Sequence, residues 1–297
     1  MNELQLTTKE EFWRAATSGN VDELVQILGF HPEFIDMKNS RCKTALLVAA
    51  QHGHVSFIEK LVQLGSKAID TPSTLMLTPL YYAAHNGHHR VVEALVRLGS
   101  KAIDTPTKRG WTPMHAAAKN GHELVVETLI RLGSKAIDST DIFLQTPLFI
   151  AAEEGHKDVV ETLVRLGSQA IDTLAQRGWT PMLVSVYRKN ASMIELLARL
   201  GSRALDAPLY DFSLLNLALE KKDSRSVRTL IALGADRSVV CVKRLTPSTR
   251  SLFLEGVDGD YARGVRYRVY FSRSLVSKLL FCLGLKRNPN SIKRYFS

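Results

Sequence analysis

Apolar and polar positions along the chain follow the spacing of short helices. Between 88 and 98, apolar residues recur at the i, i+3, i+4, i+7 spacing that gives a helix one apolar face: Val91, Val92, Leu95, Val96 and Leu98. A shorter helix is predicted before it, beginning at Thr78-Pro79, because threonine caps a helix and proline fits its first turn. Gly87 and Gly99 follow the two predicted helices and end them. The pattern therefore predicts a short helix paired with a longer one.

This pattern recurs with a period of 34 or 33 residues. One marker is Leu-Gly, which stands at 64–65, 98–99, 132–133, 166–167, 200–201 and 233–234. A second marker in phase with it is Thr-Pro, at 78–79, 112–113, 146–147 and 180–181, with fainter copies at 43–46 and 213–216. The stretch between the markers carries turn residues such as Pro106 and Gly110, and it predicts a projecting loop. Two phased markers over six copies indicate a solenoid, in which each unit buries its apolar face against its neighbours.

The repeated stretch resembles the ankyrin-repeat family. Residues 112–122 read Thr-Pro-Met-His-Ala-Ala-Ala-Lys-Asn-Gly-His, and this stretch and its equivalents precede the apolar helix and Leu-Gly over about residues 11–235. The resemblance implies an all-α solenoid of stacked helix-turn-helix repeats with projecting loops, plus a short basic C-terminal segment. We expect an N-terminal capping repeat at 1–42, six helix pairs at 43–235, and a degenerate repeat with a basic amphipathic C-terminal segment at 236–297.

The chain departs from the family pattern in two respects. Its period is mostly one residue longer than the usual 33, with the extra residue between Leu-Gly and Thr-Pro. In the last two units Lys189 replaces the helix-ending glycine, and Thr-Pro is lost at Ser213. We therefore expect less regular packing in the fifth and sixth units.

The resemblance also implies a function, because ankyrin repeats are typically protein-binding scaffolds that use their loop tips and the inner face of the first helix. The corresponding positions differ between copies of this chain, while the framework stays almost constant. These candidate partner-binding residues are Leu75, Leu77, His85, Asn86, Lys108, Arg109, Trp111, Lys119, Asn120, Ile142, Phe143, Gln145, Glu153, Glu154, Gln176, Arg177, Trp179, Tyr187 and Arg188.

Trp111 and Trp179 leave two interpretations open. Aromatic residues and arginine are enriched in interface hot spots, which favours a role in binding. The residue before Thr-Pro also packs against adjacent loops in such repeats, and aromatic side chains serve both purposes.

The histidines suggest a metal site, but their positions do not support one. His54, His88, His122 and His156 follow glycine in four successive repeats, so they recur because the scaffold recurs. No cysteine or carboxylate completes a ligand set, and no phosphate-binding glycine loop, nucleophile elbow or catalytic cysteine context occurs. We therefore expect no metal, no cofactor, no catalytic residue and no enzymatic activity.

The composition is that of a folded soluble chain, with 45% hydrophobic and 23% charged residues, so general disorder is excluded. Cys42, Cys241 and Cys282 are too scattered for a disulfide framework, which favours a reducing compartment. The N-terminus is polar and acidic, unlike a secretory signal, and no apolar run reaches membrane-spanning length. We expect a cytoplasmic location, with export into a host cell if the source is an intracellular bacterium or a virus.

The formal charge of +10 belongs to the C-terminal segment. Residues 1–235 hold 26 basic and 25 acidic side chains, whereas residues 236–297 hold 13 basic and 4 acidic ones. This segment contains a further Thr-Pro at 246–247, a short strand-like alternation at 265–269 and an apolar stripe at 274–283.

Three roles for this segment are open: a cap on the last repeat, a contact with anionic membrane, and a contact with nucleic acid. The alternative function is accordingly a peripheral membrane or nucleic-acid-associated protein whose basic tail drives binding. The leading hypothesis is a monomeric scaffold that binds another protein, of unknown identity.

Overall fold

The computed structural model describes residues 3–206 and 213–236, and within these ranges it is built of α-helices and short 3-10 helices. The α-helices come in consecutive pairs. The first member of each pair, here called an inner helix, is α1 (Glu3–Ser18), α3 (Ala45–His52), α5 (Pro79–His85), α7 (Pro113–Lys119), α9 (Pro147–Glu154), α11 (Pro181–Tyr187) or α13 (Leu214–Glu220). The second member, the outer helix, is α2 (Val21–Phe30), α4 (Val55–Gln63), α6 (His89–Arg97), α8 (Glu123–Arg131), α10 (Lys157–Arg165), α12 (Ala191–Arg199) or α14 (Ser224–Ala232).

Short 3-10 helices follow the outer helices. They are η1 (Pro32–Phe34), η2 (Ala68–Asp70), η3 (Ala102–Asp104), η4 (Ala136–Asp138), η5 (Ala170–Asp172) and η7 (Ala204–Asp206), and a further one, η6 (Gln176–Gly178), lies in a loop. No strand occurs in the part of the chain that the structure describes, where pairing is limited to an isolated bridge between Lys38 and Thr44. The predicted all-α solenoid is confirmed for these residues.

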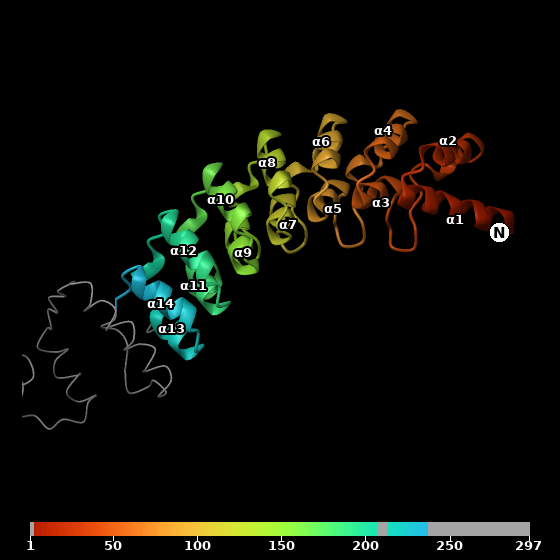
Figure 1. Ribbon diagram of the computed structural model, residues 1–297. Coiled ribbons are helices and arrows are strands. Elements are labelled where there is room, and N and C mark those ends of the chain that lie inside the picture. Colours follow the sequence, from red (N-terminus) through yellow and green to blue (C-terminus); the bar gives the residue numbers. More distant parts are fainter. Residues whose placement is uncertain (1–2, 207–212, 237–297) are drawn as a thin grey trace, which may run out of the picture.

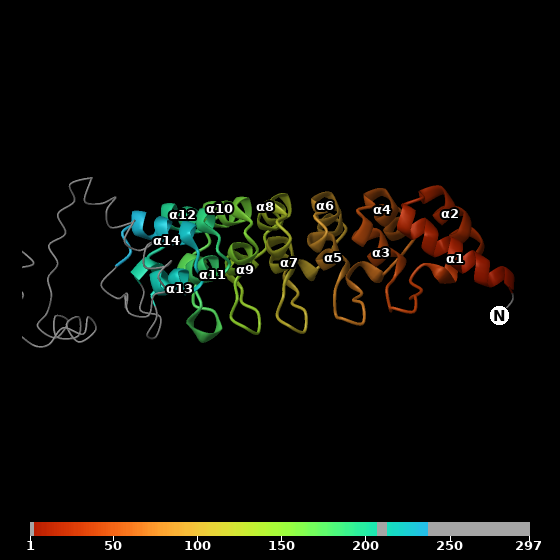
Figure 2. The same cartoon turned by 60° about the horizontal axis from the view of Figure 1, so that its bottom comes forward.

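The helix pairs stack in chain order along a gentle arc (Figure 1). Each inner helix packs against the inner helices before and after it and against its own outer helix. Ala83 and Ala84 are fully buried on α5, where their small side chains allow the neighbouring inner helices to approach closely. Val92 and Leu95 on α6 are also fully buried, and they form the apolar stripe that the sequence predicts. The loops before the inner helices project in a row from one edge (Figure 2).

Threonine and proline begin the inner helices as predicted. Thr78 Oγ1 accepts a hydrogen bond from the backbone N–H of Tyr81, at 3.2 Å, and Pro79 occupies the first turn of α5. Ser213, where Thr-Pro is lost, caps α13 in the same way by accepting from the N–H of Asn216, at 3.2 Å. The change at Ser213 therefore removes the proline and keeps the cap.

Four histidines connect each repeat to the one before it. Their Nε2 atoms lie 2.7–3.1 Å from backbone carbonyl oxygens 37 residues earlier, and a carbonyl can only accept, so Nε2 carries the proton. Each ring also covers the glycine of the preceding repeat. The four histidine–carbonyl pairs are His54 with Thr17, His88 with Gln51, His122 with His85, and His156 with Lys119.

The replacement of glycine by Lys189 has a structural explanation. Lys189 adopts a left-handed backbone conformation, with φ at 61°. Where a histidine ring would cover this position, the following repeat has Asp223, a shorter residue that caps α14 by accepting from the N–H of Arg225. A Cβ atom is therefore tolerated at 189 because the bulky ring is gone. The expected loss of regularity in the last units consists of such exchanges, and α13 still packs on α11.

A second set of hydrogen bonds between successive repeats, here called the aspartate–serine ladder, explains the near-verbatim Gly-Ser-Lys-Ala-Ile-Asp segments. The aspartate of one repeat accepts a hydrogen bond from the serine hydroxyl of the next, at 2.5 Å for Ser134 and Asp104. Its other oxygen accepts from the following backbone N–H, at 2.9 Å for Lys135. Ala235 stands at the serine position of the last described repeat, so it offers no hydroxyl. The aspartate–serine pairs are Asp36–Ser66, Asp70–Ser100, Asp104–Ser134, Asp138–Ser168 and Asp172–Ser202.

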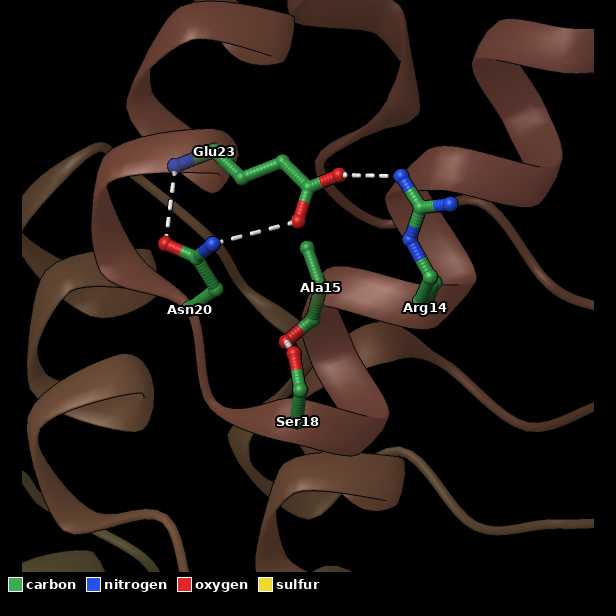
Figure 3. Close-up of polar contacts among 5 residues, drawn as sticks. All are labelled: Arg14, Ala15, Ser18, Asn20 and Glu23. Carbon is green, nitrogen blue, oxygen red and sulfur yellow. Dashed lines mark hydrogen bonds and ion pairs between the residues drawn. The ribbon is translucent and has the colours of Figure 1, made fainter.

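The first helix pair is joined by a polar network of its own (Figure 3). Asn20 caps α2 by accepting from the N–H of Glu23, at 3.1 Å, and its amide donates to Glu23 Oε2, at 3.3 Å. The other oxygen of Glu23 pairs with Arg14 of α1, at 2.9 Å. Phe12 is fully buried and contacts the ring of Phe34, and both belong to the hydrophobic core that runs along the described array.

The division into a capping repeat, six helix pairs and a C-terminal segment stays a prediction. The Thr-Pro at 246–247, the alternation at 265–269 and the apolar stripe at 274–283 lie outside the described residues.

Candidate protein-binding surface

The loops before the inner helices are short hairpins with a fixed backbone. In the loops at 39–43, 73–77, 107–111, 141–145 and 175–179, the first residue's N–H donates to the last residue's carbonyl oxygen, at 2.8–3.0 Å. The first residues Asn39, Thr107 and Asp141 add side-chain bonds within their hairpins. Asp141 Oδ1 accepts from the N–H groups of Phe143 and Gln145, both at 2.8 Å, as Asn39 Oδ1 does from Arg41 and Lys43. The middle residues of each hairpin, here called its tip, are therefore held outward on an ordered turn.

Three consecutive tips are joined directly to one another. The N–H of Ile142 donates to the carbonyl oxygen of Arg109, at 3.1 Å, and the N–H of Gln176 donates to that of Phe143, at 2.9 Å. A Cβ atom on Gly110 would lie 3.0 Å from the Cα atom of Asp141, so the two loops touch backbone to backbone. We call the hairpins at 107–111, 141–145 and 175–179 the linked tip edge.

The tips expose large apolar side chains. Ile142, Phe143 and Leu144 are 53%, 44% and 51% exposed, and Leu75 and Met76 form a similar tip two loops earlier. Leu144 and Met76 also adopt left-handed backbone conformations, with φ at 57° and 60°. A bulky residue in this conformation is strained, which draws attention to the tip as a functional surface.

The exposed side chains of the inner helices form a second surface, the inner face. Near the middle of the array, Lys119 Nζ lies 5.1 Å from the ring centroid of Trp111. The Asn120 amide donates to Nδ1 of His85 on the preceding inner helix, at 3.0 Å. The pKa of His85 is lowered by its partial burial and by the neighbouring His122 and Lys119. These residues form one cluster that spans α5 and α7.

A second cluster lies further along the inner face. The rings of Trp179 and Tyr187 meet edge to face, with centroids 5.2 Å apart, and Lys221 Nζ lies 3.7 Å from the Tyr187 centroid. Arg188 forms an ion pair with Glu153 of the preceding repeat, at 2.6 Å. The inner face therefore carries aromatic and charged side chains in mutual contact across repeats.

The remaining candidate residues have separate positions. Leu75 is exposed at its tip, whereas Leu77 and Gln145 are half-buried at the ends of their hairpins. The Asn86 amide donates to the carbonyl oxygen of Tyr82, at 2.9 Å, and Glu154 is exposed at the end of α9. The binding role of all nineteen candidates stays a prediction.

Sequence reasoning missed several residues on the same surfaces. Lys43 donates to Gln51, at 2.7 Å, and lies over the Tyr82 ring, 4.4 Å from its centroid. Lys43 stands two periods before Trp111 in the repeat register, and alignment by that register finds it. Leu144 and Met76 are likewise found by following the register of Gly110.

Comparison with known proteins decides the family. A family model for ankyrin repeats, in three copies, matches residues 12–105 and 100–173, which together are more than half of the chain. The chain belongs to the ankyrin-repeat family. Among solved structures, the human ASB11 ankyrin repeat domain is similar, with 25% identity and a TM-score of 0.65, over 76% of this chain and 98% of that chain. No curated protein matches the chain. The predicted family and ankyrin fold are confirmed.

His115 differs from its equivalents in the other ankyrin repeats. It is fully buried, its Nδ1 accepts from the N–H of Thr112, at 3.2 Å, and its Nε2 lies 3.2 Å from the carbonyl oxygen of Gln145. Burial lowers the pKa of His115, against the opposing effects of the Gln145 carbonyl and the Asp141 carboxylate. The side chain is therefore a neutral brace between α7 and the next loop.

The two interpretations of the tryptophans are both compatible with this geometry. Trp111 Nε1 donates to Asp141 Oδ2 of the next loop, at 3.0 Å, so this side chain has a structural partner. Trp179 packs on Tyr187 within its own repeat. Both indoles remain half-buried, which leaves part of each ring accessible at the base of the linked tip edge.

The described part of this ankyrin array shows neither a metal-binding cluster nor a membrane-spanning helix. No three or more His, Cys, Asp or Glu side chains group there in a way that could hold a metal ion. No described helix is both long and apolar enough to cross a membrane.

Proposed function

We propose that the chain is a protein-interaction scaffold that binds its partner through the loop tips and the inner face. Ankyrin repeats are generally protein-interaction scaffolds and are generally non-catalytic. Binding through the loop tips and the inner face is supported by a difference between two sets of residues within each repeat. Residues that join repeats recur almost unchanged until the last units, whereas exposed residues on the tips and the inner face differ from copy to copy.

The constant residues are occupied by the fold itself. In the aspartate–serine ladder, the carboxylate of Asp104 is held by the hydroxyl of Ser134 and the N–H of Lys135. The His122 ring is held by the carbonyl of His85. Their chemistry is used internally, so variation at these positions is costly. Most tip side chains make no such bond between repeats, Gln176 being the exception, so the tips can differ in sequence.

The second hypothesis, binding driven by the basic tail, rests on the sequence of residues 236–297 alone. A cytoplasmic location is likewise a proposal, based on the few scattered cysteines. The two functions differ in which part of the chain is required, so one comparison separates them.

Affinity capture with the full chain tests the proposal. We would compare the wild type with an inner-face variant, Lys119→Ala with Tyr187→Ala, and with a matched control on the outer helices, Arg90→Ala with Leu124→Ala. The scaffold function predicts that a captured protein is lost from the inner-face variant and retained by the control, with all chains folded by circular dichroism. Loss of the same protein only on truncation after Asp260 would support the tail-driven alternative.

A further inference from the structure

The chemistry of the tips alternates along the array. The tip at 40–42 carries Arg41, and the next carries Leu75 and Met76. The third carries Lys108 and Arg109, the fourth is Ile142-Phe143-Leu144, and the fifth carries Gln176 and Arg177. Since consecutive hairpins project side by side (Figure 2), basic and apolar tips follow one another in space as well as in sequence.

Hydrogen bonds make the last three tips one continuous surface. The backbone of Ile142 is bonded to Arg109 and that of Phe143 to Gln176, so the apolar tip is fixed between two basic ones. The Gln176 side chain adds a bond to the carbonyl oxygen of Ile142, at 3.2 Å. The order across the linked tip edge is therefore basic, apolar, basic.

The charges of this edge are available to a ligand. Lys108, Arg109 and Arg177 are exposed, and none forms an ion pair with a described residue. The one acidic residue in the three hairpins, Asp141, is 4% exposed and is occupied by Trp111 and two backbone N–H groups. The edge thus presents positive charge without exposed negative charge.

The backbone holds the apolar tip in place at a cost. Leu144 occupies the left-handed region at the position that Gly110 takes in the preceding hairpin and Gly178 in the following one. A glycine would remove this strain, yet the fourth tip has an exposed leucine there. Strain kept at an exposed apolar residue is typical of a binding surface.

We propose that the linked tip edge binds an extended protein segment in which apolar residues are flanked on both sides by acidic residues. The apolar side chains of the segment would pack on Ile142, Phe143 and Leu144, and its carboxylates would pair with Lys108 and Arg109 on one side and Arg177 on the other. This inference rests on the proposed scaffold function and names the kind of partner. The proposal is based on charge complementarity. The positive edge disfavours basic segments, and its two basic tips require acidic residues on both sides of the apolar residues of the segment.

Nucleic acid is the competing ligand for a basic edge. A phosphate backbone carries charge at every nucleotide, so it would have to cross an uncharged apolar tip between the two basic ones. The interruption at 142–144 therefore favours a protein segment. Single-stranded DNA enters the test as a separate arm.

The test selects peptides from a displayed library of random linear sequences on the full chain. We expect enrichment of peptides with acidic residues on both sides of an apolar cluster. A synthesised selected peptide should then bind about tenfold more weakly to Lys108→Ser with Arg109→Ser, and also to Ile142→Ser with Phe143→Ser, because each change removes anchors from one part of the edge. Raising the salt concentration should weaken binding to the wild type more than to the Lys108/Arg109 variant.

Matched controls isolate the edge. Arg90→Ser with Lys157→Ser removes two exposed basic residues from the outer helices, and Leu124→Ser removes an exposed apolar one. Both controls should bind the peptide like the wild type. Thermal unfolding checks that every variant is folded. Arg177→Asn removes the basic residue on the other side of the apolar tip, and asparagine tolerates the left-handed backbone at this position.

The outcomes separate this inference from the scaffold function. Enriched peptides without flanking acidic residues, or binding unchanged in the tip variants but lost with Lys119→Ala and Tyr187→Ala, overturn the inference and leave the scaffold function standing. Failure to enrich any peptide also overturns the inference, whereas the scaffold function fails only if affinity capture shows no protein that depends on the inner face. Binding of oligodeoxythymidine with the same sensitivity to Lys108, Arg109, Ile142 and Phe143 overturns the inference in favour of nucleic acid.

Discussion

The imidazole of His122 lies so close above Gly87 that a Cβ atom built on the glycine would be 2.7 Å from Nδ1 of the ring. Gly87 also has φ at 82°, which disfavours any residue with a side chain. The same ring donates from Nε2 to the carbonyl of His85, so it cannot move away without losing that bond. Glycine and histidine are thus coupled between neighbouring repeats.

We predict that Gly87→Ala destabilises the protein more than Gly99→Ala. Both glycines have positive φ, but nothing lies within 4 Å of a Cβ atom on Gly99. The control therefore reports the backbone strain alone, about 1–2 kcal/mol, and Gly87→Ala adds the contact with the ring. Urea unfolding of the full chain measures both. Equal losses would show that the ring does not require the glycine.

The coupling has its own test in the His122→Asp background. Asp223 stands opposite Lys189 in the native chain, where a side chain is accommodated. The cost of Gly87→Ala should therefore be smaller when His122 is aspartate, by a double-mutant cycle. An unchanged cost would assign the whole effect to the backbone.

Ser134→Ala is predicted to cost about 1–2 kcal/mol of unfolding free energy. The substitution removes a hydroxyl that donates to Asp104, at 2.5 Å, and accepts from the N–H of Ala136, at 3.2 Å. The half-buried carboxylate then keeps only the N–H of Lys135 among these bonds. In an Asp104→Ala background the serine substitution should cost less, and an unchanged cost would show that the pair is not coupled.

Ion pairs between the outer helices of neighbouring repeats should contribute little to the free energy of unfolding. Arg131 on α8 pairs with Glu93 on α6, but their side chains are 61% and 42% exposed. Exposed ion pairs are weak and screened by salt. We predict that Arg131→Ala shifts the urea midpoint less than Ser134→Ala does, and that high salt removes the difference from wild type. A larger shift than that of Ser134→Ala would contradict this ranking.

The protein should become less stable as the pH is lowered, partly because of His115. Its pKa is lowered in the fold by burial, so the unfolded chain binds the proton first as pH drops below the ordinary histidine value of about 6.5. The contribution is present above that pH and is lost as pH falls towards the folded pKa. His115→Leu, which copies Leu183 at the same register position, should have a shallower decline of melting temperature with acidification.

His52, His85 and His122 also have lowered pKa values, so the comparison must be made between wild type and His115→Leu. These three titrate in both chains, and the difference between the two pH profiles isolates His115. Parallel profiles would mean that His115 does not carry the effect.

The sequence predicts the helices well because the same start signals, end signals and apolar spacing recur in each repeat. Thr78-Pro79 and Gly87 bracket α5, and the apolar stripe at 91–98 becomes α6. The partners across repeats were harder to predict. Ser134 and Asp104 stand 30 residues apart in two repeated segments, and nothing in either segment shows that one hydroxyl meets the other carboxylate.

The candidate surface was predicted only in part for the same reason. Register placed Arg109 and Phe143 at tips, but their joining into one edge depends on backbone bonds between loops. Trp111 illustrates the limit, since its bond to Asp141 requires the spacing of adjacent hairpins. Side chains that face solvent leave no periodic signal, and only the fold shows which of them are neighbours.

Leu144→Asn should stabilise the free protein and weaken its binding to the selected peptide. Leu144 is 51% exposed with φ at 57°, so little packing is lost, and asparagine tolerates the left-handed region at up to about 1 kcal/mol less strain. Ile142→Asn is the matched control, because Ile142 is 53% exposed without a positive φ. It should weaken peptide binding without raising the urea midpoint. A fall in stability with Leu144→Asn would show that the leucine is held there by the fold rather than retained for its partner.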